Sequence, residues 1–208
     1  FQDVLAEYET SYRDSGNLQT NLMLACEAIN GTILNPGESF SFNNTVGQRT
    51  SAKGYKYADD QISTEKNRIL GGGISQISSA LYCGALQAGL QITQRHAHAY
   101  AVDYTLLGFD AAVTYGSQDL QFVNTTTDPI RILVSTDGTN VTVQLLGTVA
   151  KDAPVYTTEL KNQVLAIYNP NTVYQPMHYD NQQGYADGHV LQQGISGYEI
   201  ATYVHTYD

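Results

Sequence analysis

The first feature that could do chemistry is a serine that follows a run of glycines. Three glycines at 71–73 precede Ile74, Ser75 and Gln76, and an amphipathic helical pattern begins at Ser75. Glycines let a backbone pass close to a ligand, and the free N–H groups of a first helical turn stabilise an anion or an oxyanion. Ser75 therefore suits a nucleophile. The pattern alone favours an ordinary N-cap, a position where serine is common.

The second feature is a pair of histidines, His96 and His98, within a segment that we expect to be extended. Residues two apart on a strand project from the same face, so this pair can supply a general base or two metal ligands. Asp103 and Asp110 follow closely and could orient an imidazole or complete a metal site. A solvated polar face explains the pattern equally well. Because no HExxH pair occurs, we predict no metal and no other cofactor.

The third feature is a change of composition in the last quarter of the chain. No lysine or arginine follows Lys161, while tyrosine, glutamine, glycine and histidine accumulate. We therefore predict a β-rich extension at 150–208, after a main domain at 1–149. His178, His189 and His205 have no metal-like spacing and are expected to be surface or packing residues. Tyrosines here could stack on carbohydrate, but the pattern favours tyrosines that close a small β core.

The composition sets the class of protein. The chain has 208 residues, of which 42% are hydrophobic and 14% charged, so it can bury a core and fold. Its net charge of −10 makes nucleic acid and anionic membrane surfaces unsuitable partners, because both are bound through clustered lysine and arginine. No apolar run of about 18 residues is present, so we expect no membrane insertion in this segment.

The elements that must position these residues are two helices followed by several strands. Apolar residues recur at three- and four-residue steps in 17–30 and 75–87, which predicts helices. Beyond Ile92 the period changes to two, and Asp137-Gly138 suits a hairpin turn. This order predicts an α+β fold, with two main helices on a mostly antiparallel sheet. The expected strands are 32–34, 39–42, 100–104, 112–115, 120–123, 130–134 and 141–145.

The two cysteines give little information about chemistry. Cys26 falls on the apolar stripe of the first helix and Cys83 lies inside the second, without a CxxC spacing. Cys26 is therefore expected to be a small core residue. The sequence leaves open whether the two cysteines form a disulfide.

Several motifs in order resemble the VanW-domain family. They occur across 17–135 and cover most of the chain before the extension. The matching strings are NPGESFSFN at 35–43, VGQRT at 46–50, GY at 54–55, GGGISQISSALY at 71–82, RHAH at 95–98, LGFDAAV at 107–113, YG at 115–116 and DL at 119–120.

The resemblance implies a peptidoglycan L,D-transpeptidase that works outside the membrane, in a family named for vancomycin-resistance gene clusters. A cysteine thiolate attacks the carbonyl of the third residue of a stem tetrapeptide and releases the terminal D-Ala. The acyl group then passes to the side-chain amine of another stem. A glycine-rich loop before a helix N-terminus suits this chemistry, because it lowers a thiol pKa and holds an oxyanion.

The sequence departs from the family at the nucleophile, since Ser75 occupies the position of the cysteine that follows Gly-Gly-Gly-X. A serine hydroxyl needs a well-aligned base to react, whereas a thiol at a helix N-terminus ionises readily. We favour an engineered replacement that inactivates the enzyme, because the rest of the motif is intact and the chain begins at Phe1. A natural serine enzyme and a peptidoglycan-binding module without catalysis are the alternatives. Cys83 lies about two turns along the helix and cannot substitute.

The resemblance also implies roles for other residues. We expect His98 to act as general base, with His96 or Asp110 as its orienter. Arg95 and Arg49 would grip stem-peptide carboxylates through their planar forks. Tyr82 lies on the helical face of Ser75 and either reaches the site or belongs to the core. The predicted oxyanion loop consists of Gly72, Gly73 and Gln76.

The implied partners are peptidoglycan stem peptides. The implied location is extracytoplasmic and associated with the cell wall, with secretion or anchoring by a segment outside this chain.

Overall fold

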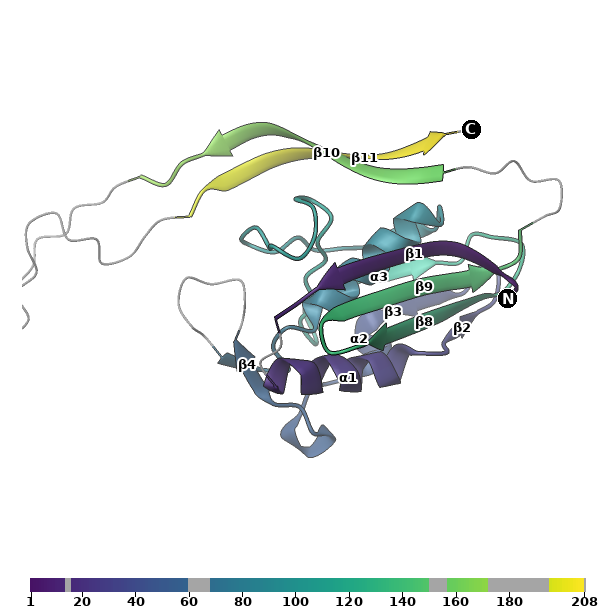
Figure 1. Cartoon of the computed structure of the whole chain (residues 1–208), viewed down its shortest axis with the longest axis horizontal. Helices are drawn as coiled ribbons and strands as arrows, with labels where there is room; N and C mark the ends of the chain where they lie inside the picture. Colours follow the sequence, from purple (N-terminus) through teal and green to yellow (C-terminus); the bar gives the residue numbers. More distant parts are fainter. Residues whose placement is uncertain (14–15, 60–67, 150–156, 172–194, 208) are drawn as a thin grey trace, which may run out of the picture.

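The computed structural model describes residues 1–13, 16–59, 68–149, 157–171 and 195–207. Its largest element is a four-stranded antiparallel sheet on which two long helices pack (Figure 1). The sheet confirms the predicted α+β fold. Its strands, in spatial order, are β1 (Asp3–Ser11), β9 (Asn140–Gly147), β8 (Ile130–Thr136) and β2 (Ile33–Leu34), and the helices are α1 (Asn17–Ile29) and α3 (Ser75–Gln87).

The core lies between this sheet and the two helices. Strand β9 alternates strictly between buried and partly exposed residues, and β8 does so over Ile130–Val134, so one face of the sheet is apolar. Leu22 and Ile29 of α1 and Ile77 of α3 are fully buried against that face. Each buried side chain of this size contributes about 1.5–3 kcal/mol. The helices are therefore fixed to the sheet mainly by apolar burial, and α3 takes its position from β1 and β9.

Both helices occupy the predicted ranges to within one residue. Helix α1 is followed by Gly31 at φ 87° and α3 by Gly89 at φ 69°, a left-handed conformation that glycine adopts without strain. The predicted turn at Asp137 and Gly138 joins β8 to β9, and Asp137 accepts the backbone N–H groups of Thr139 and Asn140. Local sequence signals were sufficient at these positions.

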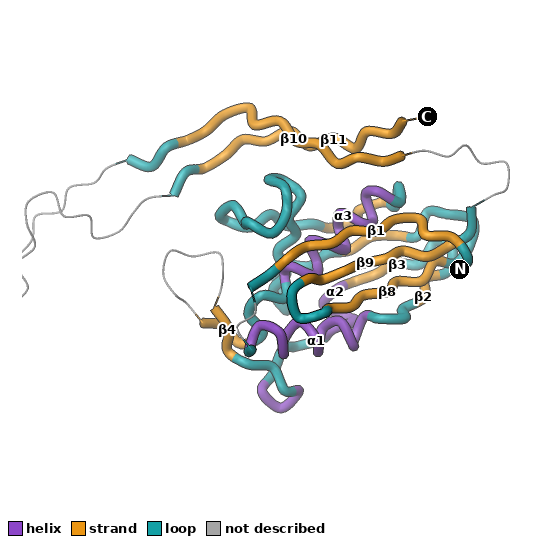
Figure 2. The backbone as a smooth tube through the Cα atoms, in the orientation of Figure 1, coloured by secondary structure: helices purple, strands orange, loops and turns teal. Residues whose placement is uncertain are grey.

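Smaller elements surround this core (Figure 2). A three-stranded sheet has the order β3 (Ser39–Ser41), β7 (Gln121–Val123), β6 (Gln91–Gln94). Phe40 of β3 stacks on Phe122 of β7 at 4.9 Å between ring centroids. The remaining elements of this part are the helix α2 (Phe42–Val46), the short 3₁₀ helix η1 (Ser51–Lys53) and the paired strands β4 (Tyr57–Asp59) and β5 (Arg68–Leu70).

Two predicted strands are wrong. Residues 100–104 and 112–115 lie in an irregular segment, where Thr114 and Gln118 form an isolated bridge. Val102 and Val113 are buried, which produced the strand-like pattern. The backbone of this segment bonds instead to side chains of neighbouring elements, including Ser79 and Asn43. His96 and His98 also lie outside a strand, because β6 ends at Gln94, so the expected shared strand face does not exist.

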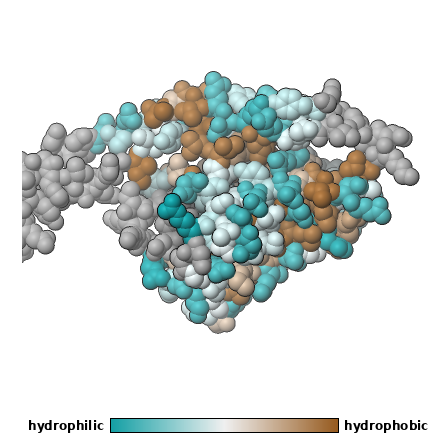
Figure 3. All heavy atoms as spheres, in the orientation of Figure 1, coloured by the Kyte–Doolittle hydropathy of each residue, from teal (hydrophilic) through white to brown (hydrophobic). Residues whose placement is uncertain are grey.

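The extension contains a long hairpin of β10 (Thr157–Tyr168) and β11 (Gly197–Tyr207). Leu160 packs with Cys83 and Phe109, and the Asn162 amide donates to the carbonyl of Leu107 at 2.8 Å. Apolar side chains also gather along the outside of the hairpin (Figure 3). The predicted boundary at 149 and 150 stays a prediction.

The expected tyrosine core of the extension is wrong for the described tyrosines. Tyr168, Tyr198, Tyr203 and Tyr207 are all more than 40% exposed. A two-stranded hairpin has too little apolar surface to enclose a core of its own. His205 lies between Tyr203 and Tyr207 on the outer face, as the expected surface residue, whereas His178 and His189 fall outside the described residues.

Both cysteines are free and buried, so the structure contains no disulfide between them. Cys26 is a core residue, as predicted. Burial raises the pKa of the Cys26 thiol to about 12 and that of Cys83 to about 11. Both thiols are therefore protonated and unreactive near neutral pH.

Candidate active site

The glycine loop sets the start of α3 through close packing. Gly73 has φ 89°, and a Cβ at this position would lie 2.0 Å from Cδ1 of Leu18. A Cβ at Gly72 would lie 2.6 Å from the carbonyl oxygen of Ala58. Only glycine fits both positions, because neither the helix nor the strand can move away without opening the core. Ser75 is thereby held at the first position of α3.

Two buried serines of α3 fasten the segment around residue 111 to the helix. The hydroxyl of Ser79 accepts the backbone N–H of Ala111 at 2.8 Å, and the hydroxyl of Ser78 donates to the Ala111 carbonyl at 2.6 Å. Both hydroxyls also donate to the carbonyl of Ser75. These bonds bring Val113 to the helix start, where its backbone N–H donates to Oγ of Ser75 at 3.3 Å.

His98 is held in one orientation by Asp110. Nδ1 of the ring lies 2.7 Å from Oδ2 of Asp110, and the backbone N–H of His98 donates to the same oxygen. Arg95 donates to the other carboxylate oxygen at 2.9 Å. Burial by itself raises the pKa of Asp110, but the His98 hydrogen bonds and the Arg95 charge outweigh it, so the pKa lies below its usual value. The carboxylate therefore stays ionised and fixes the imidazole.

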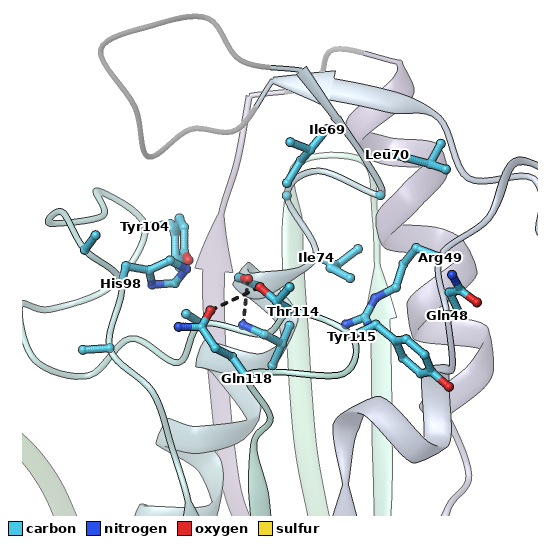
Figure 4. A pocket seen from close by; sticks show the side chains of 17 residues that line it. Gln48, Arg49, Ile69, Leu70, Ile74, His98, Tyr104, Thr114, Tyr115 and Gln118 are labelled. Atoms are coloured by element: carbon cyan, nitrogen blue, oxygen red, sulfur yellow. Dashed lines mark hydrogen bonds between the residues drawn. The ribbon is translucent and has the colours of Figure 1, made fainter.

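A cavity of about 450 Å³ joins these residues (Figure 4). Its wall includes Ser75, His98, Tyr104, Thr114, Gln118 and Arg49. His98 and Tyr104 lie at one side of the cavity, and Arg49 and Tyr115 lie at the other (Figure 4). The His98 side chain is 3% exposed, and its Nε2 has no hydrogen-bond partner among the described residues. A buried ring nitrogen without a partner in a cavity wall is available to a ligand.

Arg49 is anchored from one side of its guanidinium. Nη1 donates to the side-chain oxygen of Asn43 at 2.7 Å and to the Gly47 carbonyl at 3.2 Å, and the group lies over the ring of Phe42. Asn43 is itself fixed, because its amide donates to two backbone carbonyls and its backbone N–H donates to Asp119. The second terminal nitrogen, Nη2, is buried and has no partner within the described part of the chain.

The structure brings Ser75, His98, Asp110 and Gly73 together, and it separates other predicted residues from the cavity. The Gln76 side chain donates to Thr10 and Ser11 of β1, so it holds the helix to the sheet and cannot reach an oxyanion. Gly72 packs on β4 outside the cavity lining. His96 lies against the amide of Gln94 at 3.0 Å, so Asp110 and not His96 orients His98.

Two expected substrate-binding residues also lie elsewhere. Arg95 is engaged by Asp110 and by the carbonyls of Asp110 and Gly108, and it lies over the ring of Tyr82. Neither Arg95 nor Tyr82 lines the cavity. Asp103 is exposed, so Asp110 is the carboxylate that contacts the imidazole.

Sequence reasoning gave no role to Ser78, Ser79, Asn43 or Tyr104. The first two are consecutive serines within the apolar pattern of a helix, which is a signal for buried hydroxyls with specific acceptors. Asn43 and Tyr104 lie in irregular or short elements that carry no periodic signal. Asn43 acts through hydrogen bonds to residues more than 70 positions away in the sequence, and Tyr104 lies edge-on to the ring of His98.

Two other kinds of site are absent from the described residues. Within them no helix is long and apolar enough to cross a membrane. No group of three or more histidine, cysteine, aspartate or glutamate side chains lies close enough to hold a metal ion in the same ranges.

Known proteins show where this chain belongs. The uncharacterized protein YoaR of Bacillus subtilis is 39% identical over 142 residues, which are 68% of this chain and 47% of that protein. The vancomycin B-type resistance protein VanW of Enterococcus faecalis is 30% identical over 130 residues, 60% of this chain and 47% of that protein. The chain spans about half the length of these curated relatives. No solved structure matches it significantly.

The model of the VanW like protein family matches residues 17–146, which include the glycine loop, α3 and both sides of the cavity. This match covers more than half of the sequence, and the chain therefore belongs to the VanW-like family.

Proposed function

We propose that this cavity is a peptidoglycan acyl-transfer site of the L,D-transpeptidase type, with residue 75 in the nucleophile position. One observation carries the proposal. Ser75, at the start of α3, lines the same cavity as the buried Nε2 of His98, which Asp110 orients through Nδ1. A nucleophile, a base and an orienting carboxylate are the three parts that acyl transfer requires.

The reaction in a Ser75→Cys enzyme would proceed in two balanced steps. The Sγ proton moves to Nε2 of His98, and the thiolate bonds to the carbonyl carbon of the third stem residue. The bond to the D-Ala nitrogen then breaks, D-Ala leaves with the proton from His98, and a thioester remains. The side-chain amine of a second stem attacks this thioester, its proton returns to His98, and the new amide bond releases residue 75.

A backbone donor supports the charge that develops in these steps. The N–H of Val113 points at the side-chain oxygen of Ser75, whereas the N–H groups of Gln76 and Ile77 in the first turn of α3 donate to the carbonyls of Gly73 and Ile74. The Val113 N–H would therefore stabilise a thiolate at residue 75, and the first turn would act through the helix dipole. Removing one such donor from an enzyme of this kind typically costs about 3–4 kcal/mol of transition-state stabilisation.

Ser75 itself limits the reaction. A helix N-terminus ionises a thiol, whose pKa is near 8.5, but not a hydroxyl, so serine depends wholly on His98. We therefore propose that the chain with Ser75 is inactive or far slower than its Ser75→Cys variant. The reaction class also implies work outside the cytoplasmic membrane, where peptidoglycan is cross-linked.

A second candidate is a peptidoglycan-binding module without catalysis. The Ser75 hydroxyl favours it, because the cavity keeps its shape and its arginine but lacks a readily ionised nucleophile. Such a module would bind stem peptides and leave them unchanged.

Muropeptide mass spectrometry separates the two candidates. Disaccharide-tetrapeptide is incubated with the unaltered Ser75 chain, called the wild type in these comparisons, with Ser75→Cys and with Ser75→Cys/His98→Gln, and free D-Ala and cross-linked dimer are measured. We expect products from Ser75→Cys and a strong loss in the double variant. Product from the wild type as well would make Ser75 a true nucleophile. A folded Ser75→Cys variant without product, together with retention of the wild type on isolated peptidoglycan, would support the binding module.

A further inference from the structure

The Arg49 guanidinium has one satisfied side and one unsatisfied side within the cavity. Nη1 has two acceptors, whereas Nη2 is buried and has none among the residues that the structure describes. Arginine stays charged under all ordinary conditions, so the buried donor carries part of a positive charge. Leaving such a group without an acceptor is costly, and the site is complete only when an acceptor arrives.

The carboxylate nearest in the network does not neutralise Arg49. Asp119 accepts hydrogen bonds from Ser41, from the backbone N–H groups of Asn43 and Leu120, and from Gln121. Its oxygens are therefore occupied, and the residue that contacts Arg49 is the neutral amide of Asn43. Burial lowers the pKa of Arg49 and the charge of Asp119 opposes this shift, but no carboxylate among the described residues forms an ion pair with Arg49.

Arg95 shows the opposite arrangement in the same protein. Its guanidinium donates to the Asp110 carboxylate and to two backbone carbonyls, and it lies outside the cavity lining. Of these two arginines, only Arg49 offers a donor to the cavity that holds Ser75 and His98.

We propose that Arg49 forms a carboxylate subsite of this cavity and binds a free carboxylate of the peptide ligand through Nη2. The identity of the ligand as a stem peptide rests on the proposed function, whereas the negative charge it must carry follows from Arg49. Two carboxylates of a donor stem have this chemistry: the C-terminal group of D-Ala and the side-chain group of a third residue such as meso-diaminopimelate.

Four small probes distinguish these sources. They are Nα-acetyl dipeptides with D-Ala at the C-terminus, built with lysine or with meso-diaminopimelate and ended as a free acid or as an amide. Dissociation constants for the wild-type chain are measured by NMR titration. Losing the carboxylate that Arg49 binds should weaken binding about tenfold or more, because a hydrogen bond to a charged group is lost.

Three variants assign the effect to Arg49. Arg49→Gln should abolish the preference for the carboxylate that the wild type recognises, whether this is the C-terminal acid or the diaminopimelate side chain. Arg49→Lys should retain part of that preference, because lysine keeps the charge without the planar fork. Arg131→Gln is the matched control, since it removes the same charge from β8, outside the cavity lining. It should leave every preference unchanged. The comparison of acid and amide in the wild type holds even if an Arg49 variant folds poorly.

The proposal is overturned if the four probes bind the wild type equally, or if Arg49→Gln and Arg131→Gln lower the preference alike. The outcome is separable from the proposed function. An acid preference that depends on Arg49, without turnover by Ser75→Cys, keeps the subsite and removes the transpeptidase. Turnover by Ser75→Cys that is equal for acid and amide probes of both types keeps the transpeptidase and removes the subsite.

Discussion

The two sides of the cavity are built from the same kinds of residue but differ in which charges are paired. On one side Asp110 pairs with Arg95 and contacts His98, whose buried Nε2 has no partner among the described residues. On the other side Asp119 binds only neutral donors, and Arg49 is held by a neutral amide. The first side leaves an imidazole nitrogen without a partner in the cavity wall, and the second leaves a guanidinium nitrogen without one, among the described residues.

This difference teaches how a buried aspartate can serve two purposes. Asp110 acts on a titratable ring, so its loss should disturb chemistry. Asp119 orders the backbone at Asn43 and Leu120, so its loss should disturb folding. Neither assignment follows from burial, because the two residues are equally buried at 8% exposure.

The largest effect is expected for His98→Gln in the Ser75→Cys enzyme. Loss of the general base should reduce turnover by about 10²–10⁴-fold, with little change in the melting temperature. The measurement is D-Ala release under saturating substrate, beside thermal unfolding.

Arg49→Gln in the same background should mainly raise KM. If His98→Gln and Arg49→Gln lower kcat to the same extent, the distinction between a catalytic side and a binding side of the cavity is wrong.

Asp119→Ala should reduce stability most. It leaves buried backbone N–H groups of Asn43 and Leu120 without an acceptor, at about 1–3 kcal/mol each. Urea unfolding measures the loss. Asp103→Ala, at an exposed aspartate, is the control and should stay within about 0.5 kcal/mol of the wild type. An Asp119→Ala protein as stable as this control would contradict the structural role.

Ser79→Ala should cost about 1–3 kcal/mol, because the buried N–H of Ala111 loses its acceptor. In the Ser75→Cys background it should also slow turnover, since Ala111 adjoins Asp110 and precedes Val113 by two residues. Ser51→Ala, at an exposed serine of η1, is the matched control. Equal melting temperatures of the two serine variants would argue against a role of Ser79 in holding the segment around Ala111 to α3.

The pH dependence of stability should report the lowered pKa of the Asp110 carboxyl group. Its folded pKa is lowered, so the stabilisation it provides is complete above the unfolded value of about 4 and is lost as the pH falls through the folded value. The stability difference between the wild type and Asp110→Asn should therefore be constant near neutral pH and shrink below about pH 4. Urea unfolding across this range is the measurement, and a difference that grows on acidification would contradict the assignment.

The last prediction concerns the rate of thiol labelling in the Ser75→Cys variant, a change that should disturb the protein least. Cys26 and Cys83 have pKa values raised to about 12 and about 11 by burial, so neither should react with iodoacetamide at pH 7. A cysteine at 75 adjoins a backbone donor and a helix N-terminus and should react rapidly. Peptide mass spectrometry locates the label, and the wild-type chain is the control. Slow labelling at 75 would weaken the case for a nucleophile position.

Features encoded by local pattern were predictable. The ranges of α1 and α3, the turn at Asp137 and the strands β8 and β9 follow from periodicity, glycines and turn residues that act within a few positions. Strand β1 was missed, although its buried Ala6 and Thr10 show a partial alternation, and two false strands were placed in the segment between β6 and β7.

The sequence by itself determined that a glycine loop starts a helix at Ser75. It also supplied histidines, aspartates and arginines as candidate site residues. Only the tertiary structure decided which of them meet: His98 rather than His96, Asp110 rather than Asp103, and Arg49 rather than Arg95. The irregular segment of 95–120 carries the first two of these choices. Its path is set by hydrogen bonds to Ser78, Ser79 and Asn43 from distant elements, and such contacts leave no periodic trace in the sequence.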